Sequence, residues 1–199
     1  QTMNITMQSA TRALWGAVID PATAARQALD WRLGLGNMWM ALALVAVLNV
    51  LMLALLQAAS PMPVMAQGGM MLTPFSYAMI ITIFLFLLVY TIYHVGRMMG
   101  GQGTVEDSLT VIVLFQSISV ALEAVQVLLV VISPQIASIF GLVSLAVLIR
   151  CMVNFVNVMH RFDSLGKSLA TMIFAVIGTA LIAGIVLTVL GIAPTGGQI

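Results

Sequence analysis

Five long apolar stretches constrain this sequence more than any other feature. They cover residues 38–59, 74–96, 108–132, 135–158 and 169–191. The hydrocarbon core of a bilayer is about 30 Å thick, and roughly 20 helical residues cross it. Because lipid offers the backbone no hydrogen-bond partner, each crossing segment has to be helical. We therefore expect an all-α polytopic membrane protein, a bundle of five transmembrane helices.

The composition excludes a water-soluble fold. Of the 199 residues, 62% are hydrophobic and only 7% are charged, whereas soluble domains carry about 25% charged residues. The net charge of +1 gives no reason to expect a nucleic-acid partner, and the single cysteine, Cys151, forms no internal disulfide or metal-binding pair. Short connections leave little room for a soluble catalytic site, so we expect no enzymatic activity and no cofactor. No charged region leads into a short apolar segment, and we expect no cleavable signal peptide.

The basic residues predict the orientation in the membrane. Connections 60–73 and 133–134 and the tail 192–199 contain no Lys or Arg. The basic residues outside the apolar stretches all lie on the other side of the predicted topology: Arg12, Arg26, Arg32, Arg97, Arg161 and Lys167. By the positive-inside rule, the N-terminus is cytoplasmic and the C-terminus is periplasmic in a bacterial inner membrane.

The chain divides into a cytoplasmic N-terminal segment (1–37), a membrane domain (38–192) and a short extracytoplasmic tail (193–199). Asp20 and Pro21 are typical of a helix start, with Asp20 as the N-cap and Pro21 at the first helical position. The N-terminal segment is therefore expected to be helical and amphipathic.

Tryptophans suggest that this segment lies at the membrane surface. Trp15, Trp31 and Trp39 are expected at headgroup depth, and Arg26 has the spacing to pair with Asp30. Packing of the segment under the bundle as a cap is the alternative.

A glycine-rich turn joins the second and third stretches. Gly100 or Gly101 can end the second helix in the left-handed conformation, and Thr104 with Asp107 has capping-box spacing. A phosphate or headgroup could instead bind the glycine amides, although the acidic residues beside them would repel it. The residues expected to shape the turn and nearby helix contacts are Gly96, Gly100, Gly101, Gly103, Thr104 and Asp107.

Polar residues within the third and fourth stretches form two stripes at helical spacing. Burying Glu123 or Arg150 at the membrane centre costs roughly 2.5–3.5 kcal/mol, so we expect these two side chains to face inward and to be linked through Gln116, Ser119 or water. The favoured interpretation is interhelical hydrogen bonding that fixes helix rotation, and the alternative is a proton or ion pathway or a buried ligand site. The predicted buried network consists of Gln116, Ser119, Glu123, Gln126, Arg150, Asn154 and Asn157.

Two histidines, His94 and His160, fall at the cytoplasmic ends of the second and fourth stretches. We interpret them as interfacial residues. A haem held by two histidines on separate helices is the alternative.

Three of these features together resemble the Yip1 domain family. Asp20-Pro21 is similar to the entry into the family's amphipathic segment, and residues 94–104, with the glycine turn, resemble the turn joining helices two and three in bacterial members. Residues 161–168 are similar to the short turn into the last helix. The resemblance covers most of residues 14–191 and implies five closely spaced membrane helices after a cytoplasmic segment. Eukaryotic members are associated with Rab GTPases, but the short N-terminal segment and loops here look bacterial, so that role is not carried over.

The sequence favours a non-enzymatic membrane protein that acts by association with lipids and other membrane proteins. It would be a subunit, assembly factor or scaffold of a larger membrane complex or of local lipid organisation. A small transporter or channel that uses Glu123 and Arg150 is the alternative.

Overall fold

The computed structural model describes residues 14–59 and 74–189, which contain helices and no strand. A short helical turn at residues 14–19 precedes the labelled elements. These are α2 (Pro21–Asp30), α3 (Leu35–Ala59), α4 (Pro74–Met98), α5 (Val105–Ile132), α6 (Pro134–His160) and α7 (Leu165–Val189).

The last five of these helices are long and apolar enough to cross a membrane, which confirms the expected all-α polytopic fold. Their ends extend beyond several predicted boundaries because polar residues cap them. The Thr104 side chain accepts from the Asp107 N–H and so starts α5 at Val105. The Ser133 side chain accepts from the Ile136 N–H and starts α6 directly after α5, which gives the expected tight hairpin. The connection 60–73 and the tail 193–199 lie outside the described residues.

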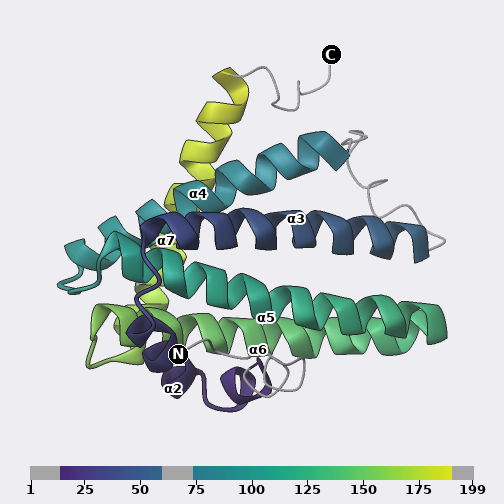
Figure 1. The fold of residues 1–199 in the computed structure, drawn as a ribbon, viewed down its shortest axis with the longest axis horizontal. Coiled ribbons are helices and arrows are strands. Elements are labelled where there is room, and N and C mark those ends of the chain that lie inside the picture. Colours follow the sequence, from purple (N-terminus) through teal and green to yellow (C-terminus); the bar gives the residue numbers. More distant parts are fainter. Residues whose placement is uncertain (1–13, 60–73, 190–199) are drawn as a thin grey trace.

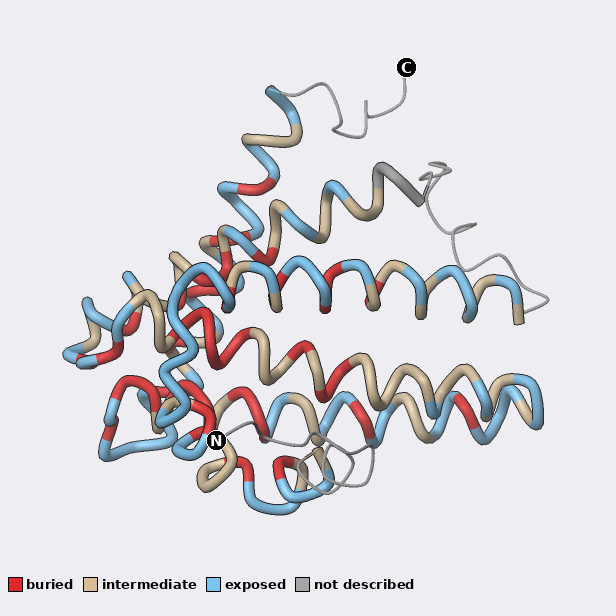
Figure 2. Tube along the Cα trace, in the orientation of Figure 1, coloured by how far each residue is buried: buried red, intermediate tan, exposed pale blue. Residues whose placement is uncertain are grey.

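The helices converge at one end of the molecule. At this end, called the charged end below, α3, α5 and α7 begin and α4 and α6 finish. Helices α3, α5 and α6 run side by side with α5 in the middle, whereas α4 and α7 pack on each other and diverge from the other three away from the charged end (Figure 1). Buried residues gather where the helices converge (Figure 2). The core of α5 accordingly lies between Ser108 and Ser119, and that of α6 lies mainly between Cys151 and His160.

The described part of the N-terminal segment, residues 14–37, packs on the bundle rather than standing apart from it. Helix α2 contacts α5 and α6, with the small side chains of Ala25 and Ala28 buried. Trp15 and Trp31 are 68% and 53% exposed. The segment thus acts as the cap that was the alternative expectation, while its tryptophans remain available to the membrane surface.

The start of α2 is as predicted. Asp20 is the N-cap and accepts from the Thr23 N–H at 3.1 Å, and Pro21 occupies the first turn. Hydrogen bonds from Thr23 lower the pKa of the Asp20 carboxyl below its usual 3.8. The expected pairing of Arg26 with Asp30 is replaced by a long hydrogen bond from the Arg26 guanidinium to the Thr23 hydroxyl, at 3.5 Å.

Candidate functional site at the charged end

His160 is the last residue of α6 and is completely buried. Its Nε2 lies 3.2 Å from the Ile92 carbonyl oxygen of α4, and its ring stacks on Phe162 with centroids 5.2 Å apart. The His160 carbonyl accepts from the Gln102 N–H at 3.0 Å. One residue therefore connects the end of α4, the glycine turn and the turn after α6.

Three glycines make room for the His160 ring. A Cβ at Gly101 would lie 2.5 Å from Nδ1, and one at Gly103 would lie 2.9 Å from the same atom. A Cβ at Gly96 would overlap the ring. The sequence singled out the glycines and the histidine separately, but it gave no sign that they meet, because the contact joins residues about 60 positions apart.

The local predictions for the glycine turn are confirmed. Gly100 has a φ of +88° and ends α4 in the left-handed region. Thr104 and Asp107 form a reciprocal capping box, with the Thr104 N–H donating to the Asp107 carboxylate at 2.9 Å. The close contact expected at Gly96 is made to a histidine ring.

The two histidines have different surroundings. His94 is exposed and makes an edge contact with Tyr93, at a centroid distance of 4.8 Å. His160 is buried, and its Nδ1 has no hydrogen-bond partner in the part of the chain that the structure describes. A haem between them would need both rings to face one space, and this arrangement does not support it.

Beside His160, an open cavity of about 900 Å³ lies between α2, the start of α5 and the turn that follows α6. We call it the charged cavity, since more than half of the protein's charged side chains line it. Its basic residues are Arg26, Arg32 and Arg161, and its acidic residues are Asp30, Glu106, Asp107 and Asp163. Within the described residues, no group of three His, Cys, Asp or Glu is placed to hold a metal ion.

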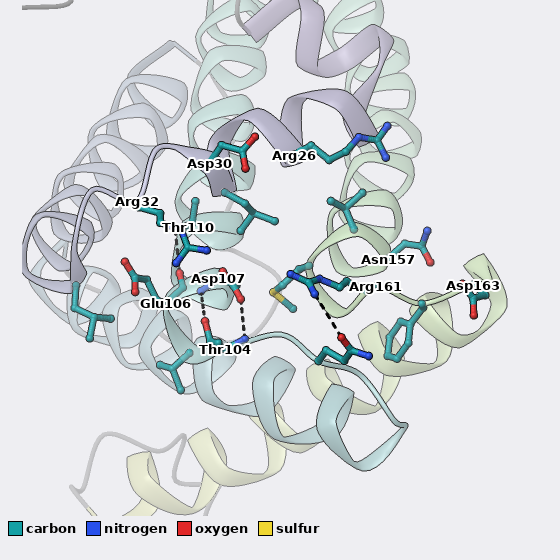
Figure 3. A pocket seen from close by; sticks show the side chains of 17 residues that line it. Arg26, Asp30, Arg32, Thr104, Glu106, Asp107, Thr110, Asn157, Arg161 and Asp163 are labelled. Atoms are coloured by element: carbon teal, nitrogen blue, oxygen red, sulfur yellow. Dashed lines mark hydrogen bonds between the residues drawn. The ribbon is translucent and has the colours of Figure 1, made fainter. Parts of the chain in front are cut away.

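The cavity could not be predicted from the sequence. Its acidic and basic residues come from three segments that are distant in the chain, and each looks like an ordinary solvated residue in isolation. Figure 3 shows Arg32 and Arg161 extending into the space between these segments from opposite sides. The only sequence signal was the concentration of charge near the predicted cytoplasmic ends of the helices.

The polar stripe on α5 is partly buried as a group. Gln116 and Ser119 are buried, whereas Glu123 and Gln126 are half-buried. The Ser119 hydroxyl donates to the Glu123 carboxylate at 2.9 Å. Gln126 packs against Gly141 of α6. A Cβ added at Gly141 would lie 3.0 Å from the Nε2 atom of Gln126. The stripe thus contributes both a hydrogen bond within α5 and a contact with α6.

The stripe on α6 departs from the expectation, because Arg150 is exposed and does not join Glu123. Its guanidinium donates to the carbonyl oxygens of Val18 at 2.9 Å and Ile19 at 3.0 Å, at the end of the short helix 14–19. A cation at the end of a helix satisfies free carbonyls and interacts favourably with the helix dipole. The expected link between Glu123 and Arg150 is therefore wrong.

Two asparagines on the same face of α6 are half-buried and make separate contacts. The Asn154 side chain donates to the Arg150 carbonyl at 2.8 Å. Asn157 accepts from the Ser168 hydroxyl of α7 at 3.1 Å. Among the described residues, Asn157 is the only one of the predicted α6 residues whose side chain makes a hydrogen bond to another span.

The family model of the Yip1 domain matches residues 15–191. The chain belongs to the Yip1 domain family. The match includes the N-terminal cap, all five spans and the glycine turn around His160. No curated protein and no solved structure gives a match. This Yip1 domain protein is thus an integral, multi-pass membrane protein that contacts lipid.

Proposed function

We propose that this Yip1 domain protein acts without catalysis, by association, as a subunit, assembly factor or scaffold of a larger complex in a bacterial inner membrane. In this proposal the charged end, with the N-terminus, faces the cytoplasm, as the distribution of basic residues predicts. The observation that carries the proposal is the large uncovered surface of the last span, α7.

Helix α7 buries only a narrow stripe of small and hydroxyl-bearing side chains: Ser168, Thr171, Ala175, Thr179 and Ala183. Large apolar residues on its other sides, such as Phe174, Leu181 and Ile185, are exposed. Lipid can cover such side chains, but an added contact with another membrane helix would also bury them.

The side of α7 that faces away from the bundle includes a position suited to close helix contact. Gly184 follows Ala175 by nine residues, and at about 100° per residue the two lie on opposite sides of the helix. A Cβ at Gly184 would meet nothing within 4 Å, and Ala180 precedes it by one turn and is also exposed. Small residues four apart let membrane helices approach closely, mainly through van der Waals contact. This supports association through α7.

The test is co-purification in mild detergent, with the mass of the particle measured by light scattering. We expect a defined partner or a second copy to remain with the wild-type protein and with Ile185→Leu, and to be lost in Gly184→Leu. Ile185→Leu is the matched control because it keeps an apolar side chain about 100° around the same helix. A monomer in all three preparations, with unfolding temperatures unchanged, would contradict the proposal.

A small transporter or channel is a second candidate, favoured by one observation, the half-buried Glu123 carboxylate bonded to Ser119 inside a membrane span. Ionisable residues at membrane depth often mark ion pathways. Proton or solute flux in proteoliposomes that disappears in Glu123→Gln, but persists in the exposed control Asp163→Asn, would support it. Absence of flux in the wild-type protein would exclude a transporter or channel function.

A further inference from the structure

The charged cavity holds basic and acidic side chains that do not neutralise one another. Within the described ranges, its three arginines form no salt bridge with its four carboxylates. Arg26 and Arg161 donate instead to neutral oxygens, those of Thr23 and Gln102, each at 3.5 Å. Asp107 is occupied by the capping box, whereas no hydrogen bond from the described residues engages the side chains of Arg32, Asp30 and Glu106. The cavity therefore presents to one space cations and anions that are not paired with one another.

Two arginines reach this space from unusual backbone conformations. Among the described residues, the only non-glycine residues with positive φ are Arg32, at 41°, and Arg161, at 54°. This region is unfavourable for a long side chain, and such residues gather at functional sites. Both arginines line the cavity, and they lie on opposite sides of it (Figure 3). The fold thus accepts local strain at two of the three positions that supply positive charge to the cavity.

The cavity borders the ends of membrane spans, where lipid headgroups are expected. Leu35 lines it and is the first residue of the span α3, while Val105 lines it and begins the span α5. On the same connection, Trp31 and Leu33 are about half exposed. Apolar side chains next to a charged hollow suit a ligand that is charged at one end and apolar at the other. A volume of about 900 Å³ also falls within the range of roughly 300–1,000 Å³ found for small-molecule sites.

We propose that the charged cavity binds an ammonium–phosphate zwitterion of the phosphoethanolamine type. Arg32 and Arg161 hold the phosphate, because the planar guanidinium fork matches phosphate oxygens. Asp30 and Glu106 hold the ammonium group, which donates up to three hydrogen bonds. A purely anionic ligand fits less well, since four carboxylates surround the same space as three arginines. The site is independent of the protein partner proposed above, because none of its residues lies on α7.

The zwitterion has two sources, a membrane phospholipid and a free phosphodiester. Native mass spectrometry of the full, delipidated chain in detergent distinguishes them. The lipid probes are phosphatidylethanolamine, phosphatidylcholine and phosphatidylglycerol with identical acyl chains, and the soluble probe is glycerophosphoethanolamine. Phosphatidylcholine has a methylated amine that donates no hydrogen bond, and phosphatidylglycerol has no cation. We expect phosphatidylethanolamine to bind most tightly. Competition by glycerophosphoethanolamine at comparable concentration would assign the soluble source, and its failure to compete would assign the lipid.

Variants test the roles of the two sets of charges. Arg161→Asn is suited to the phosphate side, since Asn tolerates positive φ, and Glu106→Gln is suited to the ammonium side. Loss of one charge-assisted hydrogen bond predicts about tenfold weaker binding of phosphatidylethanolamine in each. Glu106→Gln should leave phosphatidylglycerol binding unchanged or stronger. Lys167→Gln is the control, because Lys167 is exposed at the same end and lies outside the cavity. Equal binding of all three lipids, or cavity variants that behave like Lys167→Gln, would overturn the proposal.

Discussion

The His160 imidazole lies so close to Gly96 that a side chain at position 96 would overlap the ring. Gly96 is near the end of α4 and His160 is the end of α6, so the contact fixes how two spans finish at the charged end. Gly101 and Gly103 close around the same ring from the turn that leads into α5. The glycine turn is therefore a packing surface as well as a connection. The glycines at 101 and 103 leave the space that the imidazole ring occupies.

Gly96→Ala should destabilise the protein because its methyl group has no space beside His160. Overpacking of a filled interior typically costs 1–3 kcal/mol. The measurement is thermal unfolding in detergent, followed by circular dichroism. Gly178→Ala is the matched control, since it adds the same methyl group to the membrane helix α7 where nothing lies within 4 Å. Equal unfolding temperatures for the two variants would show that the ring does not occupy this position.

His160→Ala should reverse the effect of Gly96→Ala. Alone it removes a buried ring and its stack on Phe162, so it destabilises the protein, but it also frees the space that a methyl group at 96 requires. The double variant should therefore be more stable than the sum of the single losses predicts, with a coupling energy of about 0.5–3 kcal/mol. Simple additivity in a double-mutant cycle would contradict the packing described here.

Arg150→Gln should release the N-terminal cap without unfolding the spans. It removes the hydrogen bonds to the carbonyl oxygens of Val18 and Ile19, and hydrogen bonds to charged groups contribute about 1.5–3 kcal/mol when sheltered from water. Because Arg150 is exposed, we expect a loss at the lower end of this range. The N-terminal cap should then open about ten times more often, and tryptic cleavage after Arg26 and Arg32 should be about tenfold faster. Arg97→Gln, an exposed arginine at the end of α4, should leave these cleavage rates unchanged. Equal rates in the two variants would argue against the contact.

Local features of this fold could be predicted from the sequence, whereas contacts between distant segments could not. The spans, the Asp20 cap and the Thr104–Asp107 capping box depend on residues within one helix or turn, and all are confirmed. The predicted link of Arg150 to Glu123 was wrong, because hydropathy indicates the depth of a residue in the membrane and does not indicate which neighbour it faces. A helix end some 130 residues earlier in the chain satisfies its charge better than a distant carboxylate does.

The charged cavity shows the same limit. Arg32 and Arg161 belong to connections without a distinctive sequence pattern, and an arginine does not predict a positive φ. The cavity exists only because α2 folds back over the ends of the spans, and that packing depends on small residues such as Ala25 and Ala28. The positions of the basic residues in the sequence predicted that charge gathers at this end, but not that it encloses a space.

The stability of the N-terminal cap on the bundle should depend on pH, because Asp20 ionises. Hydrogen bonds from Thr23 lower the pKa of the carboxyl in the folded protein, so its contribution is fully present above the unfolded value of about 3.8 and is lost as the pH falls through the lower folded value. Asp20→Asn keeps an N-cap side chain but does not ionise. Unfolding temperatures measured from pH 6 to pH 2.5 should converge for the two proteins in acid. A constant difference across that range would exclude this role for Asp20.

The side chains of Thr91 on α4 and Thr179 on α7 form a hydrogen bond, with 2.5 Å between their Oγ1 atoms. This bond links the two helices that diverge from the rest of the bundle. Thr91 also lies 3.0 Å from the Leu87 carbonyl within its own helix, so its proton has a local acceptor and Thr179 is the natural donor between the helices. Thr179→Val keeps the shape and removes that donor. Hydrogen bonds between membrane helices contribute on average about 0.6 kcal/mol, and we expect a stability loss of this size. Thr188→Val is the control, because within the described residues the Thr188 hydroxyl donates only to the Gly184 carbonyl of its own helix. A cycle with Thr91→Val isolates the pair, and zero coupling would show that packing alone holds α4 against α7.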